Sequence, residues 1–593
     1  MHNKKSEVAK DFKGAITKLI KYDKSLVRLL IISLILSFIS SALAIIGPDK
    51  LKDITNIVTN NIMTGIPLDE VKKIAFVLVI IYSISAIFGY LEGFIMTTVT
   101  ARFQKKMRND ISKKINVLPL SFFDKTTVGD ILSRVTNDID NIGFTMTQSL
   151  SSIVASSTLL IGSLIMMFYT NWLLAITTIL STIIGLIFVV IIIVRSQKYF
   201  NEVQKSLGDI DGHIEETFSG HNVIKAYNAE EEMNDKFDKI NKHLFECGRK
   251  SQFLSGLMHP LMGFTGNFGY VVVCVVGSIL VLNKTIDFGV IVAFMMYIKF
   301  FTRPLMQIAQ SFTGIQSAAA ASERVFEFLE AKEMDNEKDL TDKLETKDVK
   351  GNLEFKNVHF GYNPEKEIIH GFSAKAKKGQ KIAIVGPTGA GKTTIVNLLM
   401  KFYPLNSGDI IIDDHSINNL TRENVHDLFT MVLQDTWVFE GTINENIRYN
   451  NNDITDEEII DACKKVGLHH LIKTLPKGYD TILTDADNLS AGEKQLLTIA
   501  RAMISKKPFL ILDEATSNVD TRTEELVQKA MDKLAQGKTS FIIAHRLSTI
   551  RNADLILVMN GGKIIEQGTH DELLSQNGFY AELYNSQFQE LLD

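Results

Sequence analysis

A glycine-rich loop at residues 386–393 has the residue types and the spacing that bind nucleotide phosphates. It fits the pattern G-x-x-x-x-G-K-[ST] and reads Gly386-Pro387-Thr388-Gly389-Ala390-Gly391-Lys392-Thr393. An apolar run at 382–385 precedes the loop and a helix-like segment from Thr394 follows it, which is the context that the pattern requires. We expect backbone N–H groups and the Lys392 ammonium to bind phosphate, and the Thr393 hydroxyl to ligate Mg²⁺. The alternative, a glycine-rich turn without a ligand, is disfavoured by the complete spacing.

Two carboxylates follow an apolar run further along the chain and could complete this chemistry. Residues 509–512 are Phe-Leu-Ile-Leu, and Asp513 and Glu514 come directly after them. Open α/β sheets bind ligands at the carboxyl ends of their strands. We therefore expect Asp513 to hold Mg²⁺, directly or through water, and Glu514 to polarise the water that attacks a γ-phosphate. Helix-capping or solvent-facing acids are the alternative.

The elements that would position these groups alternate between strands and helices. Short β runs are expected at 382–385, 410–413, 429–433, 509–513, 541–544 and 555–559, and residues 352–360 alternate as a half-buried strand. This alternation predicts an α/β domain over residues 351–593, and the phosphate loop and the two carboxylates make it an expected α/β P-loop ATPase domain.

The first half of the chain has the composition of a membrane protein. A chain of 593 residues is too long for one hydrophobic core. A helix needs about 20 apolar residues to cross a bilayer, and six stretches qualify, near 26–46, 74–98, 148–169, 172–194, 258–282 and 288–310. We therefore predict an α-helical membrane domain with six transmembrane helices. The net charge of −5 and the lack of a long basic run give no indication of nucleic-acid binding.

The distribution of basic residues predicts the orientation of this domain. The long polar segments 99–147 and 195–257 carry many lysines and arginines, which favours the cytoplasmic side. The N-terminus and the nucleotide domain of a multi-pass protein in the cell membrane would then be cytoplasmic too. A cleavable signal peptide within residues 1–44 is an alternative, but a leader of 24 residues before the apolar run argues against it. Apolar residues at helical spacing among lysines predict an interfacial helix in that leader instead: Phe12, Ile16, Leu19 and Ile20.

Four residues inside the predicted membrane helices are candidates for contact with a transported substrate. Glu92 is a carboxylate in an apolar segment, where burial is costly and a functional role is common. A position facing water, or a pairing with a neighbouring helix, would also explain it. Phe294, Tyr297 and Phe301 share one face of the last segment and suit an adaptable apolar wall. A packed helix interface would show the same pattern.

A charged stretch separates the two halves. Twelve of the twenty residues in 331–350 are charged, which predicts a solvated connector. We expect a transmembrane domain over 1–330, a charged linker over 331–350 and the nucleotide-binding domain over 351–593.

The run Leu489-Ser490-Ala491-Gly492-Glu493, about 20 residues ahead of the 509–513 strand, resembles the signature sequence of ATP-binding cassette proteins. The whole chain resembles a half-transporter of the ATP-binding cassette exporters, in which six membrane helices precede the cassette. The resemblance implies hydrolysis of ATP with Mg²⁺, coupled to transport. It also implies roles for four further residues: adenine stacking by Tyr362, a Q-loop role near Mg²⁺ for Gln434, the D-loop for Asp520 and the switch histidine for His545.

Two polar segments of the first half resemble the regions that couple the membrane helices of such exporters to the cassettes. The first contains Phe122-Phe123-Asp124, and the second runs through 215–220 and 223–227. Exposed phenylalanines on a polar segment call for a docking surface. We expect Phe122 and Phe123 to dock into a cleft near Gln434.

The signature differs from the usual L-S-G-G-Q form at Ala491 and Glu493. In the family this motif contacts the γ-phosphate that is bound on the partner cassette. A Cβ at Ala491 narrows that approach, and an anion at Glu493 is unfavourable there unless it turns away or pairs with a cation such as Lys494. Because this chain's own phosphate loop, Asp513, Glu514 and His545 are intact, the chain resembles one subunit of bacterial heterodimeric multidrug exporters. A homodimer stays open.

The resemblance favours an exporter of amphipathic or lipophilic compounds, with a lipid or peptide exporter as the alternative within the family. A nucleotide-gated regulatory or channel-like subunit is the alternative of another class. Glu514 argues against that class, because a regulator that barely hydrolyses ATP does not need a catalytic base.

Overall fold

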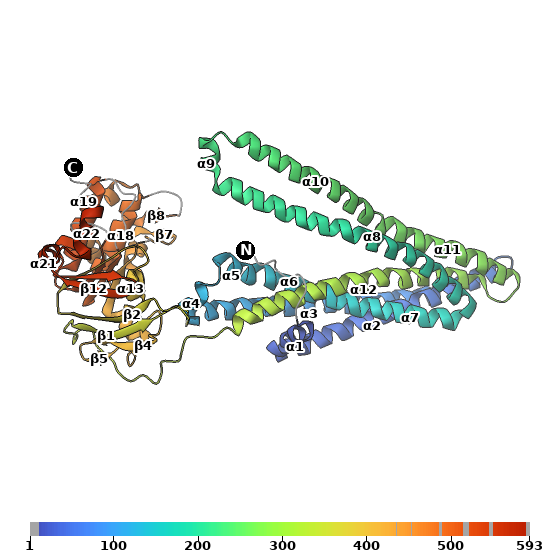
Figure 1. The fold of residues 1–593 in the computed structure, drawn as a ribbon. Helices are drawn as coiled ribbons and strands as arrows, with labels where there is room; N and C mark the ends of the chain where they lie inside the picture. Colours follow the sequence, from blue (N-terminus) through green and yellow to red (C-terminus); the bar gives the residue numbers. More distant parts are fainter. Residues whose placement is uncertain are drawn as a thin grey trace. The chain divides into compact units, whose positions relative to one another are not determined.

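The computed structural model describes residues 11–363, 365–434, 436–451, 453–484, 489–513, 521–544 and 550–588. The chain divides into two compact units (Figure 1). One comprises Met1–Asn116 with Val128–Ala331, and the other comprises Val117–Thr127 with Lys332–Asp593. The short segment that contains Phe122, Phe123 and Asp124 therefore groups with the second unit.

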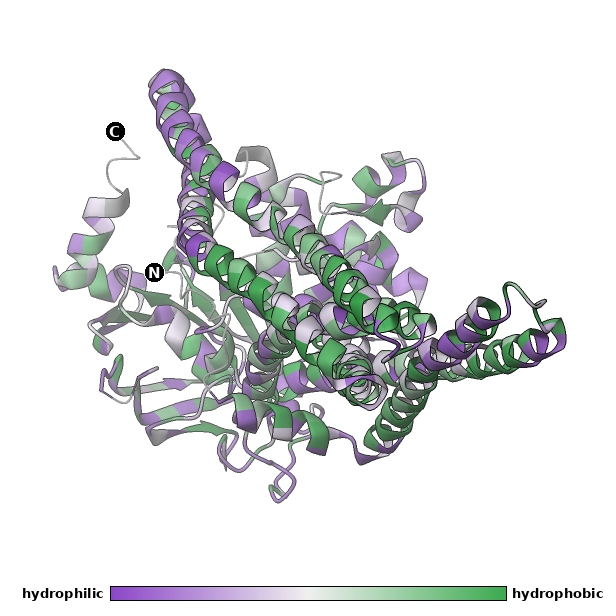
Figure 2. Ribbon diagram, turned by 90° about the vertical axis from the view of Figure 1, so that its right-hand side faces the viewer, coloured by the Kyte–Doolittle hydropathy of each residue, from purple (hydrophilic) through white to green (hydrophobic). Residues whose placement is uncertain are grey.

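The first unit is entirely helical within the described residues. Its α-helices are α1 (Phe12–Tyr22), α2 (Lys24–Asn60), α3 (Leu68–Val117), α5 (Val128–Ser133), α6 (Ile139–Thr145), α7 (Ser151–Thr170), α8 (Trp172–Ser219), α9 (His221–Ala226), α10 (Glu230–Gly256), α11 (Met258–Leu282) and α12 (Phe288–Leu329). Among the described residues, six helical segments are long and apolar enough to cross a membrane. Figure 2 shows hydrophobic residues along extended stretches of these helices. The prediction of six membrane helices is confirmed.

The predicted interfacial helix corresponds to α1. It begins after Asp11, whose carboxylate accepts a hydrogen bond from the Gly14 N–H at 2.9 Å. Phe12 and Ile20 are exposed, and the interfacial position of this helix stays a prediction. At its end, the Tyr22 ring packs edge-on against Phe103 of α3 and Phe326 of α12, at centroid distances of 5.6 and 5.7 Å. The helix is thus anchored to two of the long helices.

A polar seam joins α12 to the helices that lead into α7. Its central contact is a paired ionic bond in which the Arg324 guanidinium donates to both carboxylate oxygens of Asp138, at 2.5 and 2.9 Å. Three further hydrogen bonds continue the seam: Asn141 to Ser317, Thr145 to the Gly314 carbonyl, and Ser156 to Gln307. π-Helical turns at Arg134–Asp138 and Met146–Leu150 interrupt the regular helix along this seam. Such turns re-aim side chains without ending a helix.

The second unit is built around a sheet that, in the described part of the chain, has six strands in the order β12-β11-β3-β10-β9-β6. These are β3 (Lys381–Val385), β6 (Phe429–Val432), β9 (Phe509–Asp513), β10 (Thr539–Ile543), β11 (Leu555–Asn560) and β12 (Lys563–Gly568). The neighbouring pairs are parallel except at β12, which pairs antiparallel with β11. The inner strands are buried on both faces, which explains their continuous apolar sequences.

An antiparallel sheet with the order β2-β1-β4-β5 lies in the same unit. Its strands are β1 (Leu353–Phe360), β2 (Ile369–Ala376), β4 (Ser407–Ile412) and β5 (His415–Ser416), and a short pair is formed by β7 (Gly441–Thr442) and β8 (Ile482–Leu483). The described helices are α4 (Leu120–Phe123), α13 (Lys392–Leu399), α14 (Arg422–Leu428), α15 (Ile443–Arg448), α16 (Asp456–Lys465), α17 (His469–Thr474), α18 (Ala491–Ile504), α19 (Thr521–Ala535), α21 (His570–Ser575) and α22 (Phe579–Phe588). The predicted fold class, a helical membrane domain fused to an α/β ATPase domain, is confirmed.

Most residues of the charged linker are exposed, as expected of a solvated connector, and a few of them contact this unit. Leu344 is 9% exposed and belongs to the hydrophobic core around β1. Its N–H donates to the Asn424 side chain at 2.9 Å. Glu337 forms ion pairs with Lys401 and Arg422. The high charge density of this stretch gave no indication in the sequence that Leu344 is buried.

Candidate nucleotide site

The phosphate loop connects β3 to α13, and its glycines are required by the backbone. Gly391 has φ +98°, a conformation that other residues rarely adopt, and a Cβ there would lie 2.7 Å from Ile369 Cδ1. A Cβ on Gly386 would lie 2.2 Å from the Met559 carbonyl oxygen, which belongs to the backbone of β11. The loop therefore has its tight shape only with glycine at these positions.

Lys392 is held inside this loop. Its side chain is largely buried, and its ammonium group donates to the carbonyl oxygens of Gly386 at 2.7 Å and Pro387 at 3.2 Å. Burial lowers the pKa of Lys392, and the Asp513 carboxylate opposes that shift. Thr393 is exposed in the first turn of α13, whereas Thr394 is buried. The loop thus presents the Lys392 cation and the exposed Thr393 hydroxyl beside a helix N-terminus.

Asp513 ends β9 and is 7% exposed. Its carboxylate raises the pKa of Lys392, against the larger effect of burial. Glu514, Asp520 and His545 lie outside the described residues, so their assigned roles stay predictions.

Tyr362 lies in the connection between β1 and β2 and leans on α13. Its hydroxyl accepts a hydrogen bond from the Asn397 side chain at 3.2 Å and donates to the Thr394 hydroxyl at 3.4 Å. The ring is 41% exposed, so an adenine base could stack on it. Gln434 follows β6 and is exposed.

The signature run begins helix α18 with a reciprocal cap. The Ser490 hydroxyl accepts from the Glu493 N–H at 3.3 Å, and the Glu493 carboxylate accepts from the Ser490 N–H at 2.7 Å. Leu489 and Gly492 are buried, whereas Ala491 is exposed. The Glu493 side chain therefore folds back onto the backbone of its own motif. The sequence had suggested two other positions for this side chain, one turned away from the phosphate and one paired with Lys494. The negative charge of Glu493 stays at the helix N-terminus.

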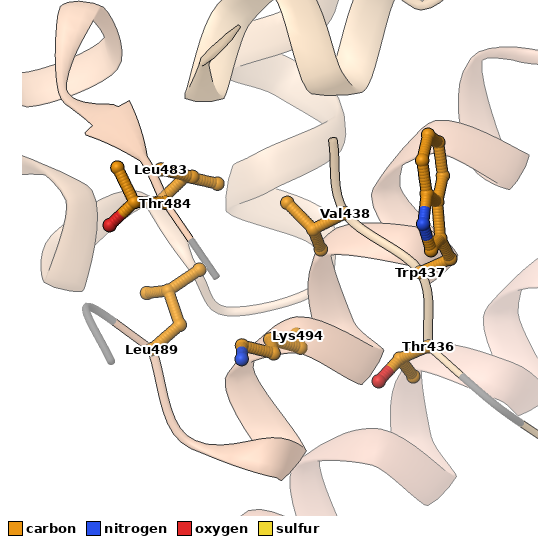
Figure 3. A pocket seen from close by; sticks show the side chains of 7 residues that line it. All are labelled: Thr436, Trp437, Val438, Leu483, Thr484, Leu489 and Lys494. Carbon is orange, nitrogen blue, oxygen red and sulfur yellow. The ribbon is translucent and has the colours of Figure 1, made fainter. Parts of the chain in front are cut away.

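Lys494 instead lines a pocket between the segment after Gln434 and the segment around the signature (Figure 3). The Lys494 side chain comes from the first turns of α18, and its ammonium group points toward the side where Leu489 lies. The lining residues are Thr436, Trp437, Val438, Leu483, Thr484, Leu489 and Lys494. The 436–438 segment and the start of α18 thus line the same cavity.

The predicted coupling residues are only partly placed by the described contacts. Phe122 and Phe123 pack edge-on against each other at 5.7 Å. Their neighbour Asp124 accepts a hydrogen bond from the Tyr403 hydroxyl at 2.7 Å. Docking of the two phenylalanines near Gln434 stays a prediction. Tyr403 was missed by the sequence reasoning, because it belongs to no recognised motif.

The four membrane candidates lie in helix contacts. The Glu92 carboxylate on α3 accepts a hydrogen bond from Ser151 on α7. Phe294 and Tyr297 are fully buried in the core formed by α7, α8, α11 and α12, and Phe301 packs against it. Among the described residues, the Tyr297 hydroxyl has no hydrogen-bond partner. Their role in substrate contact stays a prediction.

The residues at the phosphate loop fit a nucleoside triphosphate with Mg²⁺. The Lys392 ammonium donates hydrogen bonds to two carbonyl oxygens of the loop, and phosphate oxygens could replace these as acceptors. Thr393 and Asp513 supply the hydroxyl and carboxylate oxygens that Mg²⁺ prefers.

Comparison with known proteins gives two family matches that divide the chain. Residues 30–305 match the ABC transporter transmembrane region, and residues 369–517 match the ABC transporter family. A Bacillus subtilis protein, the uncharacterized ABC transporter ATP-binding protein YfiC, is 40% identical over 99% of this chain and 96% of its own length. A fatty acid ABC transporter ATP-binding/permease protein of Mycobacterium bovis is 41% identical over 88% of this chain and 82% of its own. The probable multidrug resistance protein YheH of B. subtilis is 35% identical over 85% and 75%.

Proposed function

The chain belongs to the ATP-binding cassette transporter family, as a half-transporter whose ATP hydrolysis is coupled to transport, and we propose that it exports amphipathic or lipophilic compounds out of the cytoplasm. The observation that carries this proposal is the fusion, in one chain, of six membrane-crossing helical segments within the described residues to an ATPase domain with a complete phosphate loop. The long apolar helices of this unit supply side chains of the kind that contact lipophilic compounds. The similarity to a probable multidrug resistance transporter supports the multidrug type.

Export of fatty acids or lipids is the second candidate. It is supported by the relative from M. bovis, which is named as a fatty acid transporter and is 41% identical. An acyl chain and a lipophilic drug both need an apolar binding surface. The two candidates therefore differ in the polar group of the substrate that the protein must recognise.

In the proposed mechanism, half-transporters pair in the membrane and each cassette binds ATP between its own phosphate loop and the partner's signature. Lys392 and the α13 N-terminus bind the phosphates, and Thr393 and Asp513 would hold Mg²⁺, which supplies charge neutralisation at the β- and γ-phosphates when bound. Glu514 is proposed to polarise the attacking water, and His545 to contact the γ-phosphate. Tyr362 stacks on adenine, and Gln434 responds to the bound phosphates. Closure of the cassettes on the cytoplasmic side then drives the helices from an inward-facing to an outward-facing state.

We further propose that the partner is a different subunit. The Glu493 carboxylate accepts the hydrogen bond of the Ser490 N–H. This N–H is one of the donors at the N-terminus of α18 that would face the partner's γ-phosphate. A carboxylate there repels the phosphate, and the Ala491 side chain narrows the approach. The phosphate loop of this chain would then form the hydrolytic site with a normal signature on the partner.

The test is substrate-stimulated ATPase of the purified full-length protein in proteoliposomes. We expect lipophilic dyes to stimulate hydrolysis and to be transported. Stimulation by fatty acids alone would support the second candidate, and no stimulation by any compound class would contradict the export function. The same assay without a co-expressed partner tests the dimer: full turnover and transport by this chain alone would contradict the heterodimer.

A further inference from the structure

Tyr403 connects two parts of the second unit that have separate roles in the proposed function. It follows α13, and its side chain is 7% exposed. Its hydroxyl donates to Asp124 Oδ2 at 2.7 Å. Asp124 terminates α4, where its own N–H donates to the Leu120 carbonyl. A hydrogen bond from the buried Tyr403 therefore connects the proposed coupling segment to the nucleotide-binding domain.

The ring of the same tyrosine contacts the proposed adenine-stacking residue. The Tyr403 and Tyr362 rings meet edge-to-face at 5.0 Å and 85°, and both rings also contact Phe360. Edge-to-face aromatic pairs have a preferred geometry, so a rotation of one ring changes the favourable position of the other. A base that stacks on Tyr362 would fix that ring and, through it, the ring of Tyr403.

Loss of the hydrogen bond from Tyr403 to Asp124 would be energetically costly. Burial and the adjacent carboxylate raise the pKa of Tyr403, so the hydroxyl stays protonated and donates at neutral pH. A hydrogen bond to an ionised acceptor is stronger than one between neutral groups. If Asp124 moved away, a buried hydroxyl would be left without this acceptor, which is costly.

We propose that Tyr403 is a positioning residue that links occupancy of the adenine-stacking position at Tyr362 to the position of Asp124 in the 117–127 segment. The inference rests on the proposed function and on the predicted role of that segment in coupling the cassette to the membrane helices. The link is separate from Gln434, which follows β6 and would sense the phosphates. Binding linkage is reciprocal, so a change at Asp124 must alter the affinity for ATP, although Asp124 itself belongs to no nucleotide-binding motif.

The experiment is a double-mutant cycle with Tyr403→Phe and Asp124→Asn in the full-length transporter. Tyr403→Phe removes the hydroxyl and keeps the ring, and Asp124→Asn removes the charge and keeps the shape. Equilibrium binding of ATP is measured alongside binding of inorganic tripolyphosphate, which lacks the base. Tyr479→Phe is the matched control, because its hydroxyl also bonds to a neighbouring side chain, His469, at 2.9 Å.

We expect each single variant to change the Kd of ATP about five-fold, at the low end of typical coupling between sites, and to leave the Kd of tripolyphosphate unchanged. The double variant should change it no more than either single variant, and substrate stimulation of the ATPase should fall in all three. Additive effects, an equal change for tripolyphosphate, or an equal change in Tyr479→Phe would overturn the link. If the wild type shows no substrate stimulation, the export function fails instead, and the binding cycle still decides whether Tyr403 links the two residues.

Discussion

Substitution of Glu493 by glutamine separates the structural role of the signature cap from its effect on nucleotide. In the wild type, the Glu493 carboxylate accepts the Ser490 N–H at 2.7 Å in the first turn of α18. Glutamine keeps the length and can accept the same N–H, but without charge. A charge-assisted hydrogen bond is about twice as strong as a neutral one, and an anion at a helix N-terminus contributes about 0.3–1 kcal/mol. The free energy of unfolding should therefore fall by about 0.5–1 kcal/mol.

The effect on nucleotide should have the opposite sign. In the proposed dimer, the N-terminus of α18 faces the γ-phosphate bound on the partner cassette. Removal of a like charge from this position relieves a repulsion whose size is that of other charges at helix ends, about 0.3–2 kcal/mol. Because 1.4 kcal/mol corresponds to a ten-fold change, the affinity for ATP at the site completed by this signature should rise about 2- to 30-fold.

The assay is ATP binding by the purified transporter carrying Glu514→Gln, so that hydrolysis does not deplete the nucleotide. Glu572→Gln is the matched control, because Thr569 and Glu572 form the same reciprocal cap at the start of α21. The control should lower Tm and leave the Kd of ATP unchanged. If Glu493→Gln lowers Tm but leaves Kd unchanged or weaker, the carboxylate does not oppose the phosphate, and the reasoning for a weakened signature fails.

Three further substitutions test other parts of the molecule. Lys392→Met should raise the Tm of the nucleotide-free protein and remove the Tm increase caused by ATP. Burial lowers the pKa of Lys392 in the folded state, so its charge destabilises the folded protein below that pKa and has no effect above the pKa of the unfolded state. The difference in Tm between the variant and the wild type should therefore vanish in alkaline buffer. A difference in Tm that does not depend on pH would contradict this. Asp138→Ala should reduce stability by about 3 kcal/mol, because Arg324 loses its partner in the α12 seam; a Tm within one degree of the wild type would contradict it. Glu514→Gln should retain ATP binding and lose turnover, and an unchanged ATPase rate would reject its role as the base.

Local sequence patterns predicted much of this fold, and the exceptions have physical reasons. Long apolar runs identify membrane helices, and buried parallel strands such as β9 have continuous apolar sequences, so both were found. Strand β12 was missed because it lies at the sheet edge and alternates exposed and half-buried residues. Strand β2 was missed because its apolar residues are interrupted by Gly371, at φ +71°. The burial of Leu344 depends on where the linker docks, which composition does not reveal.

The candidate site shows the same division. The phosphate loop and the signature are contiguous motifs, so sequence alone located them. The contact between Asp124 and Tyr403 joins residues 279 positions apart, and only the folded chain brings them together. The sequence also identified Glu493 as an anomaly without fixing its contact. The reciprocal cap supplies that contact and shows that the residue serves α18 even if it weakens a phosphate site.

The Glu493 cap also gives a way to determine the composition of the dimer. In a homodimer, each cassette carries both the intact phosphate loop and the capped signature, so Glu493→Gln acts at every site at which ATP is hydrolysed. In a heterodimer, this chain's signature completes only the partner's site, whereas Glu514 acts at the other site. Glu493→Gln should then change the affinity of one of two bound nucleotides and leave kcat close to that of the wild type, while Glu514→Gln abolishes turnover. If both nucleotides shift together and kcat changes with them, the two cassettes are equivalent and the heterodimer is rejected.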